Sequence, residues 1–509
     1  MIHKILILIF FLNSFAHLAA ECKIESISNI KESGADFAVA DIYVSTPLEL
    51  TNALATVTAG GNIYISDSNG SNYVFNTKIS ITKSGTSGNL ISLLPNPANT
   101  TRIKLDFSSM AENSSNRAIT LSGSYWHIKG LDIFGAGDNG MFIGGSNNLI
   151  EFCTFSECKD TGLQIGSGGS NNTILNCDSF FNADSTLENA DGFACKLDAG
   201  TGNKFIGCRA WQNLDDGWDG YLRPADNITT THENCWAIKN GYLKNGTIGA
   251  GDGNGFKTGG SDDKLLKHNA IYKNCIAVGN VFDGFDHNSN RGDVTLYNCG
   301  AYSNGRNINF GNSNIANSLT IKNTISFSGV SGGDSYSATT TNITNNSWQN
   351  GLVANASDFV SLDIALLTSP RKADGSLPDI DFMKLVPGSD LIDKGVNVGL
   401  PFNGVAPDLG AFETIALGLN DFEFEEGIYN YPNPFSTETN IVFNIKQASK
   451  IQVSLYNLMG VKVFDITEKV YTAGTNSILL KRDKLSSGNY LLVVKGEDNE
   501  RNSKIISIR

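Results

Sequence analysis

The segment Cys177-Asp-Ser-Phe-Phe-Asn182 carries a pattern that recurs four more times in the 509-residue chain. Each copy has a Cys, a small residue two positions later, and an Asn five positions after the Cys. The other copies are Cys208-Arg-Ala-Trp-Gln-Asn213, Cys235-Trp-Ala-Ile-Lys-Asn240, Cys275-Ile-Ala-Val-Gly-Asn280 and Cys299-Gly-Ala-Tyr-Ser-Asn304. Successive cysteines lie between 24 residues (275 to 299) and 40 residues (235 to 275) apart. A fixed core with variable spacing is typical of a solenoid whose coils carry loop insertions.

The Cys and the small residue of each copy share one face of a short strand, because side chains alternate with a period of two. On that face they would point into a narrow interior, where an unpaired Cys behaves as a small apolar residue. The Asn would follow at a turn and hydrogen-bond to the Asn of the next coil. The sequence therefore predicts an all-β, parallel β-helix with a buried cysteine column and an amide ladder. A framework of disulfides is the alternative.

A second pattern lies between the copies of the first and aligns five tetrapeptides. They are Thr161-Gly-Leu-Gln164, Asp191-Gly-Phe-Ala194, Asp216-Gly-Trp-Asp219, Asn254-Gly-Phe-Lys257 and Asp283-Gly-Phe-Asp286. Coils of a parallel β-helix are about 4.8 Å apart, so aligned residues are neighbours in space. The third position should stack inside the coil, and the first and fourth positions should flank that stack. The alignment brings acidic side chains from two coils together and places Lys257 one coil further on.

Carboxylates this close repel one another unless a cation neutralises them, and oxygen ligands in an irregular set are typical of Ca²⁺. We therefore predict a calcium site at Asp191, Asp215, Asp216 and Asp219. Ordinary turn chemistry is the alternative for the Asp-Gly pairs, but it does not account for Asp219 at a strand position. Lys257 is the candidate base, and the alternative is a surface lysine paired with Asp219 and Asp286.

Four runs of this region resemble polysaccharide lyase family 9. They are Asp191-Gly-Phe-Ala-Cys-Lys-Leu197, Gly202-Asn-Lys-Phe-Ile-Gly-Cys-Arg-Ala-Trp211, Asn213-Leu-Asp-Asp-Gly-Trp-Asp219 and Asn254-Gly-Phe-Lys-Thr-Gly-Gly260. The resemblance covers residues 36–414 and implies a right-handed parallel β-helix that cleaves pectate. It also implies that the four aspartates bind calcium and that Lys257 is the catalytic lysine.

The substrate that this resemblance implies is polygalacturonate, in which β-elimination requires removal of the C5 proton beside a carboxylate. A calcium ion between that carboxylate and the aspartates would stabilise the developing charge, and Lys257 would take the proton. The carboxylates of neighbouring sugars need cations, and the candidates for substrate binding are Lys196, Arg209, Arg223, Lys264 and Arg291. A lyase for another uronan such as alginate, and a non-catalytic β-helix adhesin, are the alternatives.

The N-terminus predicts export from the cytoplasm. Lys4, the apolar run 5–12 and Leu18-Ala-Ala20 are typical of a secretory signal peptide over residues 1–20. Cys22 raises the question of lipidation, but Glu21 directly before it fits that processing poorly. The formal net charge of −13 argues against nucleic acid as a partner. We expect a secreted or cell-surface monomer.

The composition changes after the β-helix. An acidic linker is predicted over 415–427, followed by alternating strands over 428–509 that predict a small antiparallel β-sandwich. Three motifs resemble the C-terminal sorting domain of the type IX secretion system: Tyr431-Pro-Asn-Pro-Phe435, Leu455-Tyr-Asn-Leu-Met-Gly-Val-Lys-Val463 and Ser487-Gly-Asn-Tyr-Leu-Leu492. This resemblance implies the type IX machinery as a partner, and a carbohydrate-binding or fibronectin-like module is the alternative.

Overall fold

The computed structural model describes residues 41–414 except 312, and residues 428–509 except 446–448, 458–460, 473, 484 and 496–500. The chain divides into two compact units, of which the first ends at Ile415. The predicted signal peptide, residues 36–40 and the predicted linker at 415–427 lie outside the described residues. Within the described chain, no helix combines the length and apolar character needed to cross a membrane.

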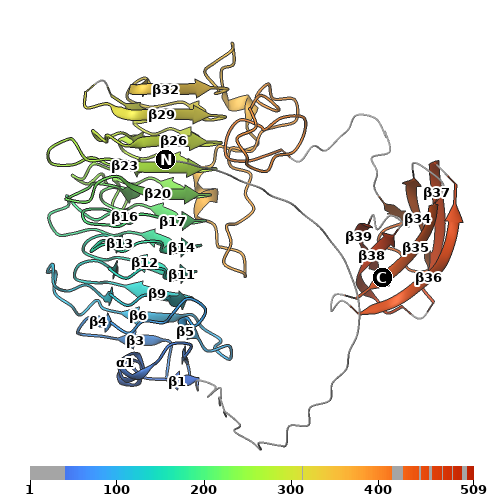
Figure 1. Ribbon diagram of the computed structural model, residues 1–509, viewed down its shortest axis with the longest axis horizontal. Coiled ribbons are helices and arrows are strands. Elements are labelled where there is room, and N and C mark those ends of the chain that lie inside the picture. The colour runs from blue at the N-terminus through green and yellow to red at the C-terminus, as the bar shows by residue number, and fades with distance from the viewer. Residues whose placement is uncertain are drawn as a thin grey trace, which may run out of the picture. The chain divides into compact units, whose positions relative to one another are not determined.

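Three parallel sheets wind around the axis of the first unit, as Figure 1 shows for the coils stacked from β1 to β32. Sheet A contains β1 (Ile42–Val44), β2 (Asn62–Ile65), β5 (Ile91–Pro95), β8 (Trp126–Lys129), β11 (Leu149–Glu151), β14 (Thr173–Leu175), β17 (Asn203–Ile206), β20 (Ile228–Glu233), β23 (His268–Lys273), β26 (Asp293–Tyr297), β29 (Ala316–Lys322) and β32 (Ala338–Thr344). Sheet B contains β3 (Asn72–Val74), β6 (Ile103–Asp106), β9 (Leu131–Phe134), β12 (Thr154–Ser156), β15 (Asp178–Phe180), β18 (Arg209–Trp211), β21 (Trp236–Ile238), β24 (Ile276–Val278), β27 (Gly300–Tyr302) and β30 (Ile325–Phe327). Sheet C contains β4 (Ile79–Ile81), β7 (Ile119–Leu121), β10 (Met141–Ile143), β13 (Leu163–Ile165), β16 (Phe193–Cys195), β19 (Trp218–Asp219), β22 (Phe256–Lys257), β25 (Asp283–Asp286), β28 (Arg306–Phe310) and β31 (Ser335–Tyr336). The prediction of an all-β parallel β-helix is confirmed.

The predicted columns hold the coils together. The five asparagines form a buried ladder in which each side-chain amide donates to the next, as from Asn213 Nδ2 to Asn240 Oδ1 at 3.0 Å and from Asn240 Nδ2 to Asn280 Oδ1 at 2.9 Å. The cysteines of the five copies are buried and unpaired, and no disulfide forms among the described cysteines. Because a buried amide without a partner is costly, this ladder fixes the register between coils.

A short helix, α1 (Pro47–Thr56), closes the N-terminal end of the β-helix (Figure 1). The Thr46 side chain accepts a hydrogen bond from the backbone N–H of Glu49, and Pro47 occupies the first turn, where its missing N–H is not needed. Leu50, Ala53 and Leu54 are buried. The helix therefore covers the open end of the core.

The segment that follows the last coil covers the outer face of sheet B. Its residues, which include the 3₁₀ turns η1 (Ala356–Asp358) and η2 (Ile364–Thr368), join one apolar cluster with outward residues of β21 and β24. Leu367, Phe382 and Leu391 are buried in that cluster against side chains such as Trp236 and Ile276. This segment therefore closes the outer face of sheet B.

The second unit consists of two antiparallel sheets around its own apolar core. One sheet contains β33 (Tyr429–Tyr431), β34 (Glu438–Ile445) and β37 (Gly474–Lys481), and the other contains β36 (Lys462–Tyr471), β35 (Ser449–Tyr456), β38 (Gly488–Lys495) and β39 (Arg501–Ile508). The predicted antiparallel β-sandwich is confirmed.

Candidate active site

Sheet C aligns the predicted site residues on consecutive rungs. Asp219 of β19 pairs in register with Lys257 of β22, and Lys257 pairs with Asp286 of β25. The aromatic residues one position earlier stack inside the coil, with ring centroids 4.8 Å apart between Trp218 and Phe256. This inward stack turns Asp219 and Lys257 to the outer face of the sheet, because successive side chains on a strand point to opposite sides.

The acidic residues meet at the turn that leads into this sheet. Carboxylate oxygens of Asp191, Asp215 and Asp216 lie within 4.8 Å of one another, and all three residues belong to the turns before β16 and β19. Asp216 is completely buried; its Oδ1 accepts hydrogen bonds from the backbone and side-chain amides of Asn254. Its Oδ2 makes no hydrogen bond, although the Lys257 ammonium is 3.1 Å away. A buried carboxylate oxygen is thus aimed into the cluster without a donor of its own.

Two lysines border the cluster. Lys257 Nζ lies 3.1 Å from Asp216, 3.0 Å from Asp252 and 3.9 Å from Asp219. Lys196 Nζ lies 2.6 Å from Asp191 and 3.2 Å from Asp219. Asp219 therefore stands between the two ammonium groups, outside the tight group of three carboxylates.

Burial and mutual repulsion control ionisation in the cluster. Burial, followed by the charge of Asp191, raises the pKa of Asp215 to about 7, and burial also raises the pKa of Asp216 well above its usual range. Burial pulls the pKa of Lys257 down, but the carboxylates of Asp216 and Asp219 outweigh it and hold that pKa well above its usual value. Without a further cation, the raised pKa values of Asp215 and Asp216 favour their protonated forms. The raised pKa of Lys257 likewise keeps this lysine protonated, so that it cannot accept a proton.

These residues fit a calcium ion. When ionised, the four predicted aspartates outnumber the two lysines that border them, so the cluster carries an excess of negative charge that a divalent cation would reduce. The donor atoms are carboxylate oxygens, the hard ligands that Ca²⁺ takes. The unbonded oxygen of Asp216 supports the same conclusion.

A groove of about 580 Å³ runs from this cluster along the outer face of sheet C. Asp219, Lys196 and Tyr221 line one part of it, and Gln164, Asp138 and Arg117 line another. Because strands β7, β10, β13 and β16 follow one another in the sheet, the groove extends from the cluster toward the N-terminal coils.

The other predicted substrate-binding cations lie in different settings. Arg209 is 3% exposed on β18 of sheet B, where it pairs with Asp178 at 2.8 Å and donates to backbone carbonyls of the closing segment. Arg291 uses its guanidinium on the carbonyls of Lys264 and Ile315 and on the Asn314 side chain. This geometry favours structural roles for both arginines over the predicted contact with substrate.

Arg223 lies in the segment that follows β19, and Lys264 lies in the segment that follows β22. Arg223 is exposed and pairs with Asp262, which also accepts a hydrogen bond from the Tyr221 hydroxyl at 2.6 Å. Lys264 is half-buried in a loop, and its carbonyl accepts a hydrogen bond from Arg291. Of the five predicted cations, only Lys196 contacts the aspartate cluster.

Asp252 belongs to the site but escapes sequence reasoning. Its carboxylate contacts Lys257, and its backbone N–H donates to Asp215 Oδ1 at 2.5 Å. It lies in the loop 241–253, where a side chain at Gly251 would come within 2.7 Å of the Leu214 carbonyl. The alternating glycines at 249, 251 and 253 are the signal that could have indicated such a close approach.

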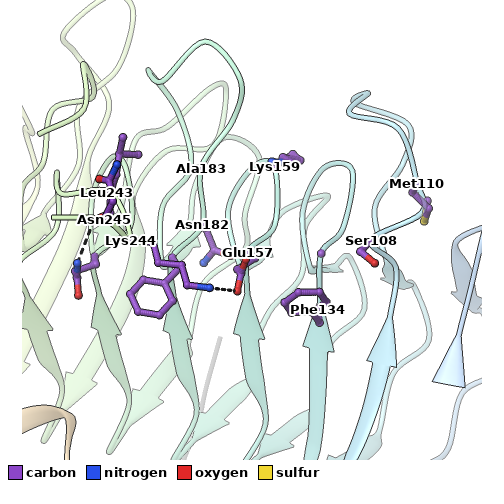
Figure 2. Close-up of a pocket in the computed structure, with 13 residues that line it drawn as sticks. Ser108, Met110, Phe134, Glu157, Lys159, Asn182, Ala183, Leu243, Lys244 and Asn245 are labelled. Carbon is purple, nitrogen blue, oxygen red and sulfur yellow. Dashed lines mark hydrogen bonds and ion pairs between the residues drawn. The ribbon is translucent and has the colours of Figure 1, made fainter. Parts of the chain in front are cut away.

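Figure 2 shows a second hollow, of about 470 Å³, at the corner where the strands of sheet B end. Lys244 reaches across it to Glu157 at 2.7 Å, so these two charges neutralise each other. Phe134 and Phe181 supply apolar walls, and Lys159 borders this hollow as well as the groove.

Comparison with known proteins identifies both units. The Pel9A-like, right-handed β-helix region matches residues 33–323, and the secretion system C-terminal sorting domain matches residues 430–509. Pectate lyase L of Dickeya chrysanthemi is 36% identical over 431 residues, which cover 79% of this chain and 96% of the relative. The crystal structure of pectate lyase Pel9A is 34% identical with a TM-score of 0.64, and the match covers 74% of this chain and 97% of that chain. A rhamnogalacturonan lyase structure is 28% identical with a TM-score of 0.60 and covers 68% of this chain and 96% of that chain.

The match to the β-helix region spans more than half of the chain, and the relatives are covered almost completely. The sorting domain at the C-terminus indicates a secreted or cell-surface protein. The chain belongs to the Pel9A-like family of right-handed β-helices and is a polysaccharide lyase.

Proposed function

We propose that this protein is a secreted pectate lyase that cleaves α-1,4-polygalacturonate by β-elimination, with Lys257 as the base and one Ca²⁺ as cofactor. The observation that carries the proposal is the position of Lys257, one rung from Asp219 and 3.1 Å from Asp216, beside a tight group of buried carboxylates. The pectate lyases among the relatives of this chain support the choice of substrate.

The reaction breaks the bond between C4 and the glycosidic oxygen after a base takes the C5 proton. The glycosidic oxygen leaves with one fragment and takes up a proton, from Lys257 or water, to become the hydroxyl of its new reducing end. The other fragment is an oligogalacturonide with a C4–C5 double bond at its new non-reducing end. Bound Ca²⁺ supplies Lewis-acid stabilisation of the negative charge that develops next to the sugar carboxylate. We assign Asp191, Asp215, Asp216 and Asp219 to its binding. Oxygens of the first three lie within 4.8 Å of one another, and Asp219 lies beside them between the two lysines.

Lys257 takes the proton at Nζ, so it must be neutral when the substrate is in place. Asp216 and Asp219 raise its pKa only while their own charges are uncompensated. When Asp216 and Asp219 bind a cation, their charges no longer raise the pKa of Lys257, which then falls toward its ordinary value. At alkaline pH a larger fraction of Lys257 is neutral and can accept the proton. Asp252 holds the ammonium at the open side of the site.

The test replaces Lys257 by Ala and uses Lys204→Ala as control, because Lys204 is exposed on β17 of sheet A. Ultraviolet absorbance reports unsaturated uronides from polygalacturonate, methylated pectin, alginate and rhamnogalacturonan, with and without a chelator. We expect product from polygalacturonate, a loss of at least about a thousandfold in Lys257→Ala, and no activity with chelator. Activity on alginate or rhamnogalacturonan alone contradicts the proposed substrate. A nearly unchanged rate in Lys257→Ala contradicts the proposed base.

We propose further that residues 1–20 are removed as a signal peptide, that residues 36–414 form the catalytic domain, and that 415–427 link it to the sorting domain at 428–509. The match of residues 430–509 to a sorting domain supports export through the type IX machinery. The enzyme acts as a monomer in this proposal. Mass spectrometry of the secreted protein shows whether residues 1–20 and the sorting domain have been removed. Light scattering shows whether the protein is a monomer.

A further inference from the structure

The outer face of sheet C differs on the two sides of Lys257. Toward the C-terminal coils, the next rung carries Asp286, and the loop residue Asp252 contacts Lys257 itself. Arg306 already uses two of its guanidinium nitrogens, Nε and one terminal nitrogen, to donate to Asp283 at 2.8 and 2.9 Å. A polyanion that extends in this direction meets carboxylates whose charge is not compensated by Arg306.

Toward the N-terminal coils, the column that carries Asp219 continues through uncharged side chains. Asp219 pairs in register with Ala194, Ala194 with Gln164, and Gln164 with Phe142. Ala194 leaves room above the sheet, and the groove of about 580 Å³ lies over this part of the face. Its volume is in the range of sites that enclose small ligands or segments of a polymer.

Two cations line this groove beyond Lys196. Arg117 is held in place by Asp138, at 3.2 Å, and by the Phe142 ring, whose centroid lies 3.7 Å below the guanidinium. Asp138 offsets the charge of Arg117, but Arg117 donates to it through Nε alone. With 33% of the side chain exposed, its terminal N–H groups remain for a ligand. Lys159 is exposed at the turn before β13, on the same groove.

Three acids that line the groove accept hydrogen bonds from loop residues. Glu112 accepts hydrogen bonds from the backbone N–H and hydroxyl of Ser185, and Asp184 accepts from the backbone N–H groups of Glu188 and Asn189. Asp160 accepts from the backbone N–H and hydroxyl of Thr161. These hydrogen bonds hold the carboxylates in place but leave their charges, so the groove carries both signs. Outside the aspartate cluster, Arg117 and Lys159 are the cationic donors in its lining that an anionic ligand can use.

We propose that Arg117 and Lys159 form a subsite for uronate carboxylates, so that the longer part of the substrate lies over β16, β13 and β10 on the N-terminal side of Lys257. The planar guanidinium suits a carboxylate because it offers paired N–H donors in one plane. Lys159 provides a second, more mobile positive charge. This inference rests on the proposed function for the identity of the sugar.

The test compares Arg117→Ala, Lys159→Ala and the double variant with Lys204→Ala as control. With polygalacturonate we expect the KM to rise about tenfold in the double variant at unchanged kcat, and the increase to shrink at high salt. With trigalacturonate, which is too short to reach from Lys257 to both residues, we expect all variants to match the wild type. Arg117→Lys should retain part of the affinity that Arg117→Ala loses, because lysine keeps the positive charge but lacks the paired N–H donors of the guanidinium.

Affinity electrophoresis in gels that contain polygalacturonate, with chelator present, separates this inference from the proposed function. Retardation of the wild type that is lost in the double variant supports the subsite even if no unsaturated product forms, in which case only the proposed reaction fails. Lys159 is exposed, so Lys159→Ala and Lys159→Glu test the proposal without risk to the fold if the Arg117 variants do not fold. An unchanged KM and unchanged retardation in folded Lys159→Glu and in the double variant overturn it.

Discussion

Lys257 contacts two kinds of carboxylate. Asp216 is fully buried, whereas the Asp252 side chain is 65% exposed. An exposed ion pair contributes at most about 1 kcal/mol, so water or an incoming ligand readily replaces Asp252. A buried pair is different, because a charge left without its partner in the interior carries a large desolvation penalty. The Lys257 ammonium thus keeps its buried partner, Asp216, and can exchange its exposed partner, Asp252, for water or a ligand.

Asp216→Asn should weaken calcium binding by at least about a hundredfold, since it removes one charged ligand whose Oδ2 has no other hydrogen bond. Isothermal titration calorimetry with CaCl₂ measures the affinity directly. The control is Asp283→Asn, because Asp283 occupies the equivalent position two coils further on and pairs with Arg306. Equal calcium affinity in Asp216→Asn and wild type would remove Asp216 from the ligand set.

Asp252→Asn should shift the pH dependence of the rate. The charge of Asp252 is one of the causes that raise the pKa of Lys257, so its removal lowers that pKa and the neutral lysine forms at lower pH. The rising limb of kcat/KM against pH should move to lower pH by less than about one unit, because Asp252 is exposed. Asp262→Asn, an exposed acid paired with Arg223, is the control. A shift to higher pH, or none, contradicts this role.

The elements of the β-helix are predictable where residues form columns. The Asn ladder and the aromatic stack recur once per coil, and the spacing between coils makes every aligned pair a contact. The same reasoning could have placed Arg209, because Asp178 and Arg209 follow the Cys in adjacent copies and pair in register on β15 and β18. Asp252 could not be placed in this way, since it belongs to a loop outside the repeat.

His232 makes the aromatic column of sheet A sensitive to acid. Its ring stacks between Phe205 and Tyr272 at 5.3 and 4.6 Å, and burial, with a contribution from His268, lowers the pKa of His232 to about 3. In the unfolded chain His232 binds a proton near pH 6.5, whereas in the folded state it stays neutral down to about pH 3. The stabilising contribution is therefore complete above pH 6.5 and is lost as the pH falls toward 3.

His232→Phe should remove this dependence, and the Nδ1 atom that it deletes has no hydrogen-bond partner. Between about pH 7.5 and pH 5, the wild type should lose about 2 kcal/mol more unfolding free energy than the variant. Urea denaturation followed by fluorescence at both pH values gives the difference. Parallel losses in the two proteins would show that His232 is not the group that titrates.

At the scale of the whole molecule, the three sheets of the first unit have different outer faces. Sheet C presents charged side chains and the groove, whereas the outward residues of β21 and β24 are apolar and need a cover. The runs Trp236-Ala-Ile238 and Ile276-Ala-Val278 already show apolar residues on both faces of a strand. Such runs predict burial on both sides. They do not say which segment supplies the cover, because that depends on where the chain returns after the last coil.

A chain that ends at residue 414 should fold and keep its lyase activity. Among the described residues, the apolar clusters of the first unit draw on residues 42–412, and the cluster of the second unit draws on residues 428–508. The melting temperature and the rate of unsaturated product formation should equal those of the full chain.

A chain that ends at residue 350 is the matched comparison, because it lacks Leu367, Phe382 and Leu391 and leaves Trp236 and Ile276 exposed to water. Exposed apolar surface of this kind destabilises a domain and promotes association, so the shorter chain should melt lower and aggregate. Equal stability of the two truncated chains would mean that the segment after the last coil does not hold sheet B, and loss of activity in the longer one would give the second unit a part in the fold of the first.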